Sequence, residues 1–161
     1  MRIYVASSWR NEARQQQCVL HLRAEGHEVY DFRRPAPGNE GFSWRNVTEE
    51  PERMRDPTHY RRVLEHPIAV EGFCLDMDAL RACEACVLVL PCGRSAHWEL
   101  GWAAGATKRC LVWLDDPVSE PELMYRGCDP RPWTEHAYAG TTLGLCLTLD
   151  EVVSRLSGDM R

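Results

Sequence analysis

The sequence contains no apolar run of about 18 residues, the length that a membrane-spanning helix needs. It has no recognisable signal peptide either, because residues 1–5 lead directly into a predicted strand. A length of 161 residues suits one domain with a hydrophobic core. We therefore expect a single cytoplasmic domain, residues 1–161, that has no membrane partner.

Positive charge is also scarce. The chain has 19 lysine and arginine residues against 24 aspartate and glutamate residues, which gives a formal net charge of −5. Because a negatively charged protein is repelled by nucleic-acid phosphates and by anionic membranes, neither is the expected partner. Lys108 is the only lysine, and the abundant arginines either serve carboxylate or phosphate recognition or reflect genome composition.

Two glycine-rich phosphate-binding motifs are missing as well. No GxGxxG follows the first predicted strand and no Walker-type lysine loop occurs, which argues against dinucleotide and nucleoside-triphosphate binding. The eight cysteines include a single CxxC pair, Cys83 and Cys86, and no second pair answers it. We therefore expect no metal site and no disulfide framework, but small buried cysteines in a reducing compartment.

Short apolar runs alternate with amphipathic segments along the chain. The predicted strands are residues 2–6, 28–32, 86–90, 109–114 and 145–148. The predicted helices are residues 10–25, 58–65, 68–82, a helix from Ser95 onward, residues 120–125, and 151–156 after an Asp150 cap. This alternation predicts an α/β fold with an open parallel sheet of four or five strands and helices on both faces.

The stretch 32–57 is rich in proline and glycine and is expected to form a long loop. It carries Phe42, Trp44 and Arg45, which can close over a planar ligand as a lid. Binding loops and packing loops share this composition, so the same aromatic residues are equally suited to covering part of the core. Both interpretations stay open at this point.

The stretch 87–106 contains the acidic residue of greatest interest. Its buried strand is stopped by Pro91, a turn follows, and Ser95 has the side chain of a helix N-cap. Glu99 lies about one turn into the helix, where the helix dipole favours the ionised carboxylate. An ionised, partly buried carboxylate can act as a nucleophile. The alternative is a charge that merely stabilises the helix terminus.

The ends of the first and central strands are expected to meet over one crevice, since ligands collect at the carboxyl ends of parallel strands. The residues placed there are Tyr4, Ser7, Ser8, Trp9, Gly93, Arg94, Ser95 and Glu99, and Asp76 could reach the same crevice. Two carboxylates suit cleavage of a glycosidic bond, one for the sugar carbon and one for the proton of the leaving group. Trp9 can stack on a flat leaving group such as a nucleobase.

Four short segments resemble the nucleoside 2-deoxyribosyltransferase superfamily, which includes nucleoside 5′-monophosphate N-glycosidases. They are IYVASSW at 3–9, GHEV at 26–29, DMDAL at 76–80 and GRSAHWELGWAAG at 93–105. The resemblance implies a flavodoxin-like fold, no metal or organic cofactor, and a nucleoside or nucleotide as the small-molecule partner. It also implies a homodimer or larger homo-oligomer with sites near the subunit contacts.

The resemblance also assigns roles to individual residues. Glu99 matches the glutamate that attacks C1′ of the sugar, and Asp76 matches the aspartate associated with proton transfer to the base. Tyr4 matches the tyrosine that orients the nucleophile, and Trp9 an aromatic residue against the base. The predicted reaction is therefore cleavage of an N-glycosidic bond, with the sugar passed to water or to a second base.

The sequence departs from this pattern six residues before the glutamate, at Gly93. Transferases of the family carry an acid there and monophosphate hydrolases a serine. Arg94 and Ser95 can receive a phosphate at the helix N-terminus, or the substrate is an unphosphorylated nucleoside. Other functions that stay open are a non-catalytic nucleotide sensor with Glu99 on a ribose hydroxyl, and an NAD-cleaving enzyme that releases nicotinamide.

Four further residues have two interpretations each. Trp98, Trp102 and Tyr125 suit either a subunit interface or core packing. His97 stands between the candidate site residues, but a single helical histidine is interpreted first as a structural hydrogen-bonding residue.

Overall fold

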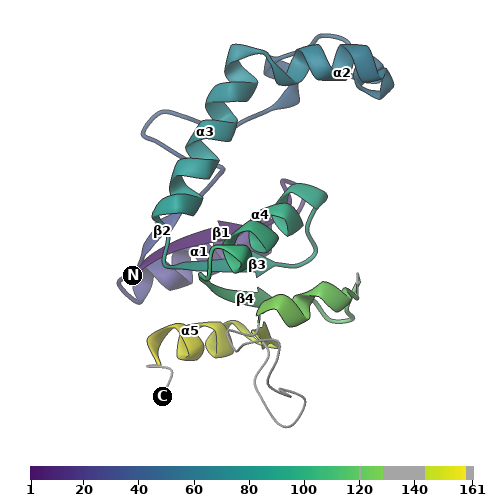
Figure 1. Cartoon of the computed structure of the whole chain (residues 1–161). Coiled ribbons are helices and arrows are strands. Elements are labelled where there is room, and N and C mark those ends of the chain that lie inside the picture. The colour runs from purple at the N-terminus through teal and green to yellow at the C-terminus, as the bar shows by residue number, and fades with distance from the viewer. Residues whose placement is uncertain (120, 129–143, 159–161) are drawn as a thin grey trace. The chain divides into compact units, whose positions relative to one another are not determined.

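The computed structural model describes residues 1–119, 121–128 and 144–158 (Figure 1). The chain folds into two compact units. The first comprises Met1–Tyr30 with Ala82–Arg161, and the second comprises Asp31–Arg81. The first unit contains the sheet, and the second contains the long predicted loop and two α-helices.

The first unit is built on a five-stranded parallel sheet in the order β2-β1-β3-β4-β5. Its strands are β1 (Arg2–Ala6), β2 (Glu28–Tyr30), β3 (Ala85–Val89), β4 (Arg109–Trp113) and β5 (Leu145–Cys146). This order is the flavodoxin-like arrangement, in which ligands bind at the carboxyl ends of the strands. The α/β prediction, with five parallel strands, is confirmed.

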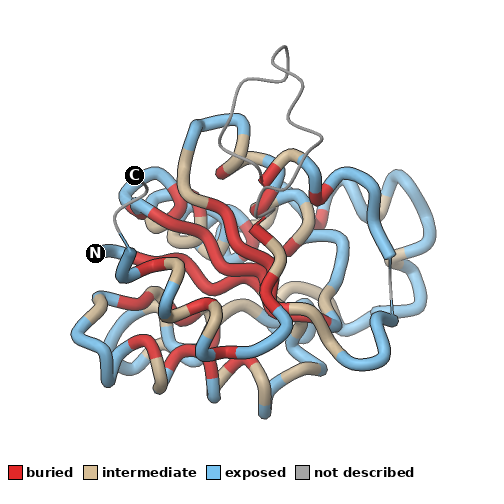
Figure 2. The backbone as a smooth tube through the Cα atoms, turned by 90° about the horizontal axis from the view of Figure 1, so that it is seen from below, coloured by how far each residue is buried: buried red, intermediate tan, exposed pale blue. Residues whose placement is uncertain are grey.

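The strands are buried because both faces of the sheet are covered, and Figure 2 shows the buried residues concentrated along them. On one face, Ile3, Val5 and their neighbours form a core with side chains of α1 (Glu12–Ala24) and α5 (Leu149–Ser157). On the other face lies α4 (Arg94–Gly105), with the Cys110 thiol 3.9 Å from the carbonyl oxygen of Leu100. Continuous apolar strands are the pattern expected of such a two-sided sheet.

Local hydrogen bonds at the turns set several element boundaries. Gly26 follows α1 with a φ of 83°, the left-handed backbone that the prediction of a helix-ending glycine requires. The second strand ends at Tyr30, two residues before its predicted end, because Asp31 begins a turn in which its carbonyl oxygen accepts the N–H of Arg34 at 2.9 Å.

Two predicted helix caps were wrong. Gly93, in extended backbone, is the N-cap of α4, and Ser95 lies inside the first turn. Thr148, not Asp150, caps α5 and accepts the N–H of Glu151 at 3.2 Å. The last strand is correspondingly shorter than predicted, because Leu147 donates its N–H to the Glu151 carboxylate at 2.7 Å instead of extending the sheet.

The segment predicted as a short helix at 120–125 is the 3-10 helix η3 (Leu123–Cys128). The stretch predicted as irregular, 133–144, lies outside the described residues except for Gly144.

Lys108, the single lysine, precedes β4 and donates to the Cys83 carbonyl oxygen at 2.6 Å, which joins the turns before β3 and β4. None of the helices in the described residues combines the length and apolar character needed to cross a bilayer.

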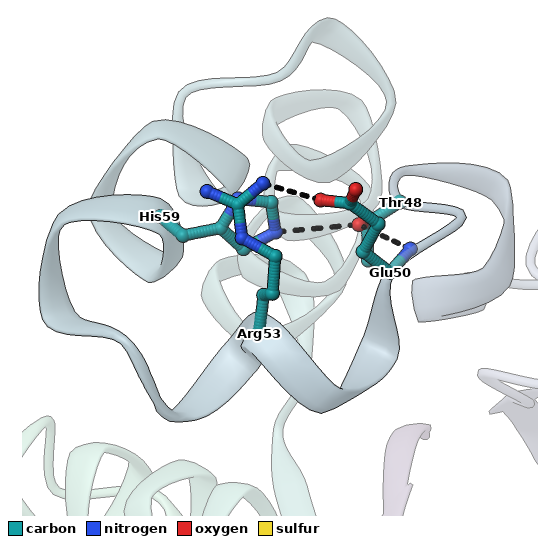
Figure 3. A network of polar contacts seen from close by, with 4 residues as sticks. All are labelled: Thr48, Glu50, Arg53 and His59. Carbon is teal, nitrogen blue, oxygen red and sulfur yellow. Dashed lines mark hydrogen bonds and ion pairs between the residues drawn. The ribbon is translucent and has the colours of Figure 1, made fainter.

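Four helices begin in the second unit: η1 (Trp44–Asn46), η2 (Pro51–Arg55), α2 (Pro57–Leu64) and α3 (Pro67–Ala82). Two of them, η1 and η2, lie within the segment 32–57 that was predicted as a loop. The proline-directed break between α2 and α3 is confirmed, since Pro67 begins α3. Within this unit, the Thr48 hydroxyl lies 3.3 Å from His59 Nε2 and accepts the N–H of Glu50 at 3.1 Å, beside the Arg53–Glu50 ion pair (Figure 3).

The aromatic residues of the loop pack within their own unit. The rings of Phe42 and Trp44 meet edge-to-face with centroids 4.8 Å apart, and Trp44 lies 6.2 Å from Tyr60 of α2. A Cβ on Gly72 of α3 would come within 3.0 Å of Phe42, so this glycine permits the close approach. These contacts lie within the second unit, and both the lid and the covering of the core stay predictions.

The cysteines are mostly buried hydrophobic residues, as predicted. All eight are free thiols, of which Cys74 is exposed, Cys92 half-buried and the other six buried. Desolvation by burial raises the pKa of Cys18 and Cys110 to about 12, and that of Cys128 and Cys146 to about 11, from an ordinary 9.0. The folded protein therefore holds these thiols in the neutral form at neutral pH.

Alkaline pH is expected to destabilise the protein through these thiols. Above pH 9.0 the unfolded chain releases thiol protons that the folded chain retains up to about pH 11 or 12. Because the unfolded state then binds fewer protons, the free energy of unfolding falls as pH rises. The thiol contribution is complete below pH 9.0 and is lost as pH rises through the folded pKa values. Urea midpoints at pH about 8 and about 10.5 measure the effect.

Two variants isolate the thiol contribution. Cys18→Ala is expected to make the alkaline slope shallower, by at most about 1.4 kcal/mol per pH unit. Cys74→Ala removes the exposed thiol and is expected to leave the slope as it is. Equal slopes in the wild type and Cys18→Ala would contradict the prediction.

Candidate active site

The loops after β1 and β3 are tied together at the carboxyl edge of the sheet. The Ser7 hydroxyl donates to the carbonyl oxygen of Val89 at 2.8 Å. The Asn11 side-chain amide donates to Ser7 Oγ at 3.3 Å and to the carbonyl oxygen of Pro91 at 3.0 Å. The structure thus places Ser7 beside the turn that leads into α4, in the region where an open α/β sheet binds ligands.

Glu99 is a half-buried residue of α4. The pKa of Cys86 in β3 is raised mainly by burial, and the Glu99 carboxylate is among the nearby charges that raise it further. Cys86 pairs in register with Tyr4 of β1, which is fully buried. Glu99 and Tyr4 therefore lie on the same face of the sheet, near its centre.

The remaining predicted binding residues of the first unit lie around this edge. Ser8 accepts the N–H of Arg10 at 3.2 Å, and Trp9 is 46% exposed, which leaves ring surface that a ligand can contact. Gly93 has no side chain to cap α4, and Arg94 and Ser95 are exposed in the first turn. A helix start with no side-chain cap and an adjacent arginine suits an anion.

The predicted second carboxylate, Asp76, belongs to the other unit. It is a half-buried residue of α3. Its neighbour Asp78 is exposed and forms an ion pair with Arg81 at 2.9 Å. As expected from their spacing, the two carboxylates do not share a face of the helix. The role of Asp76 stays a prediction.

His97 of α4 contacts Cys92, which precedes the helix, and Tyr125 of η3, two contacts that the sequence did not indicate. His97 Nδ1 lies 3.1 Å from the Gly93 carbonyl oxygen and 3.4 Å from Cys92 Sγ, and Nε2 lies 2.9 Å from the Tyr125 hydroxyl. The rings of His97 and Tyr125 are stacked, with centroids 5.8 Å apart. Of the three aromatic residues with two interpretations, Tyr125 is buried, Trp102 is half-buried and Trp98 is 53% exposed, so burial favours core packing for Tyr125.

No metal-binding cluster of three or more histidine, cysteine, aspartate or glutamate residues occurs within residues 1–119, 121–128 and 144–158. The residues near the carboxyl edge supply hydroxyls, an indole ring and an arginine beside a helix start, and Glu99 supplies a carboxylate nearer the centre of the sheet. This set suits a reaction at a sugar carbon whose positive charge a carboxylate can stabilise or trap.

No family model matches the sequence, and no curated protein matches it. Among solved structures, one that matches is the CMP N-glycosidase BcmB of Clostridium botulinum, with a TM-score of 0.50 and 18% sequence identity. The match covers 97% of this chain and 98% of that chain. At this level of identity the likeness concerns the fold, so the chain shares along nearly its whole length the fold of a CMP N-glycosidase.

Proposed function

We propose that the protein is an enzyme that cleaves the N-glycosidic bond of a nucleoside 5′-monophosphate or nucleoside, with Glu99 as the nucleophile. The observation that carries the proposal is the position of Glu99, half-buried in α4 and close enough to Cys86 of β3, the register partner of Tyr4, for its charge to raise the pKa of that thiol. The whole-length likeness to a CMP N-glycosidase supports the same reaction class.

The proposed reaction has two steps. First, a Glu99 carboxylate oxygen attacks C1′, the bond from C1′ to the base nitrogen breaks, and the base leaves with the electron pair and takes up a proton. Second, water or another base attacks C1′ of the glycosyl ester and releases Glu99 as a carboxylate. Trp9 offers a surface on which the leaving base can stack. The resemblance of the DMDAL segment gives Asp76 the proton transfer to the base, and Asp76→Asn tests that role.

The 5′-phosphate is assigned to the start of α4. Gly93 leaves the first-turn N–H groups without a side-chain cap, and Arg94 adds a guanidinium that can bind two phosphate oxygens. Monophosphate hydrolases of the resembled family carry a serine where this chain has Gly93. In this chain, Arg94, Ser95 and the backbone of α4 are proposed to bind the phosphate instead. An unphosphorylated nucleoside would lack all of these contacts.

The direct experiment is incubation of the purified protein with nucleoside monophosphates, beginning with CMP, and with the corresponding nucleosides, followed by chromatography of the free base. We expect base release from at least one monophosphate. A competing base in the mixture distinguishes transfer, which yields a new nucleoside, from hydrolysis. Tight nucleotide binding without base release would favour the sensor, and release of nicotinamide from NAD would favour the NAD-cleaving enzyme.

Arg94→Ala tests the phosphate assignment. We expect the KM for the monophosphate to rise by about 10- to 100-fold, because a hydrogen bond to a charged group contributes about 1.5–3 kcal/mol. The KM for the matching nucleoside is expected to stay unchanged, which makes the nucleoside the internal control. Equal effects on both substrates would show that Arg94 does not recognise the phosphate.

A further inference from the structure

The first unit contains a cavity of about 660 Å³ between α4 and η3. Arg94, His97, Gly101 and Ala104 line it from one flank of α4, at the three- and four-residue spacing of a helix face. Glu99 is not among the lining residues. The cavity is therefore distinct from the position of the proposed nucleophile, and its volume suits a small organic ligand.

Cys92 and His97 both line this cavity, and their side chains are in contact. The sulfur lies 3.4 Å from His97 Nδ1, and the other ring nitrogen lies 2.9 Å from the Tyr125 hydroxyl. Nδ1 faces both the Gly93 oxygen and the sulfur, and Nε2 faces the phenol oxygen, so the imidazole ring lies within reach of the thiol proton. A histidine in contact with a cysteine can accept its proton and pair with the thiolate.

The position of Cys92 in the chain adds to this effect. It directly precedes Gly93, the N-cap of α4, so its sulfur is close to the positive end of the helix dipole. Cysteines at helix N-termini beside histidine are those with increased thiolate character. Cys128, which also lines the cavity, is the opposite case, because burial raises its pKa to about 11 and keeps it a thiol.

We propose that Cys92 is a modification site, a nucleophilic thiol that His97 activates for exchange with a small disulfide bound in this cavity. The Cys92 proton passes to His97, and the thiolate attacks one sulfur of the disulfide. A new sulfur–sulfur bond forms as the old one breaks, and the leaving thiolate takes the proton from His97. The step needs no other oxidant, and it does not depend on the proposed N-glycosidase function.

The lining indicates the class of disulfide. Arg94 and the uncapped start of α4, which the proposed phosphate site also uses, suit a carboxylate, and Glu122 suits an ammonium group. Leu100, Ala104 and Met124 provide apolar surface between them. A disulfide of short, zwitterionic, peptide-like halves matches this combination of charges, and oxidised glutathione is the probe of that class.

The experiment follows the reaction of the whole protein with oxidised glutathione by intact mass, and locates the adduct by peptide mapping. Cys74 is the internal control, because it is exposed while Cys92 is half-buried. We expect Cys92 to react at least about tenfold faster than Cys74 near neutral pH, and Cys92→Ser to abolish the fast phase. A faster reaction at Cys74, which is the order that exposure alone would give, overturns the proposal.

His97→Gln tests the activation. We expect the Cys92 rate to fall about tenfold and its pH profile to move to higher pH, with an unchanged circular dichroism spectrum. Among the described residues, the charged and titratable groups that line the cavity around this pair are Arg94, Glu122, Tyr125 and Cys128. Tyr125→Phe removes only the hydroxyl and is the second variant. A wild-type pH profile in both variants would exclude activation by His97.

Discussion

Glu99→Gln is expected to lower the rate of base release by about 1,000-fold or more while the protein stays folded. The amide has the size of the carboxylate but cannot attack C1′ or stabilise the positive charge that develops there. Losses of this size are typical when the group that reacts with the substrate is removed. The measurement is kcat by chromatography of the free base, with the thermal midpoint as the check on folding.

Two comparisons sharpen this prediction. Glu122→Gln is the matched control, because it removes a carboxylate that lines the α4–η3 cavity and is expected to leave base release unchanged. An intact-mass search for a covalent sugar adduct on the wild type, absent in Glu99→Gln, follows the proposed intermediate. Full activity in Glu99→Gln would end the assignment of the nucleophile.

Gly144→Ala is expected to lower the free energy of unfolding by at least about 2 kcal/mol. A Cβ at this position would overlap the carbonyl oxygen of Cys110 in β4, and would also come within 3.1 Å of the Cys128 Cβ. The clash involves backbone, which cannot rotate away as a side chain can. The same residue accepts the N–H of Val112 at 2.6 Å, so any shift weakens the pairing of β5 with β4.

The matched control is Gly101→Ala in the middle of α4. Nothing lies within 4 Å of a Cβ built there, so the substitution is expected to stabilise the helix by about 0.5–1 kcal/mol. Urea denaturation of the two variants should therefore give shifts of opposite sign. A Gly144→Ala midpoint equal to that of the wild type would contradict the predicted clash.

The fold was predictable because its strongest signals are local. The buried strands are short apolar runs, and Gly26 and Pro67 mark helix boundaries through their own backbone geometry. A helix N-cap was less predictable where two nearby residues can both accept the first free N–H groups of the helix. Thr148 and Asp150 each carry a capping oxygen, and burial of Leu149 in the core favours the earlier start.

Within the candidate site, only contacts that follow from strand order were predictable. The contact of Asn11 with the Pro91 carbonyl joins residues 80 positions apart, and no pattern around Asn11 indicates it. Tyr125 meets His97 across 28 positions, from a short helix whose bounds differ from the predicted ones. Such contacts depend on how the turns after β3 and before η3 fold back, which side-chain periodicity does not encode.

The hydrogen bond from the Lys108 amine to the Cys83 carbonyl oxygen places the single lysine where a label can be attached. Because parallel strands all begin at one edge, this amine sits at the pole of the sheet opposite the turns after β1 and β3. Apart from the terminal amine, lysine-directed acylation can attach a fluorophore at one place only. A dye held there would report the opening of the β3–β4 pair during unfolding without obstructing a molecule bound at the far pole.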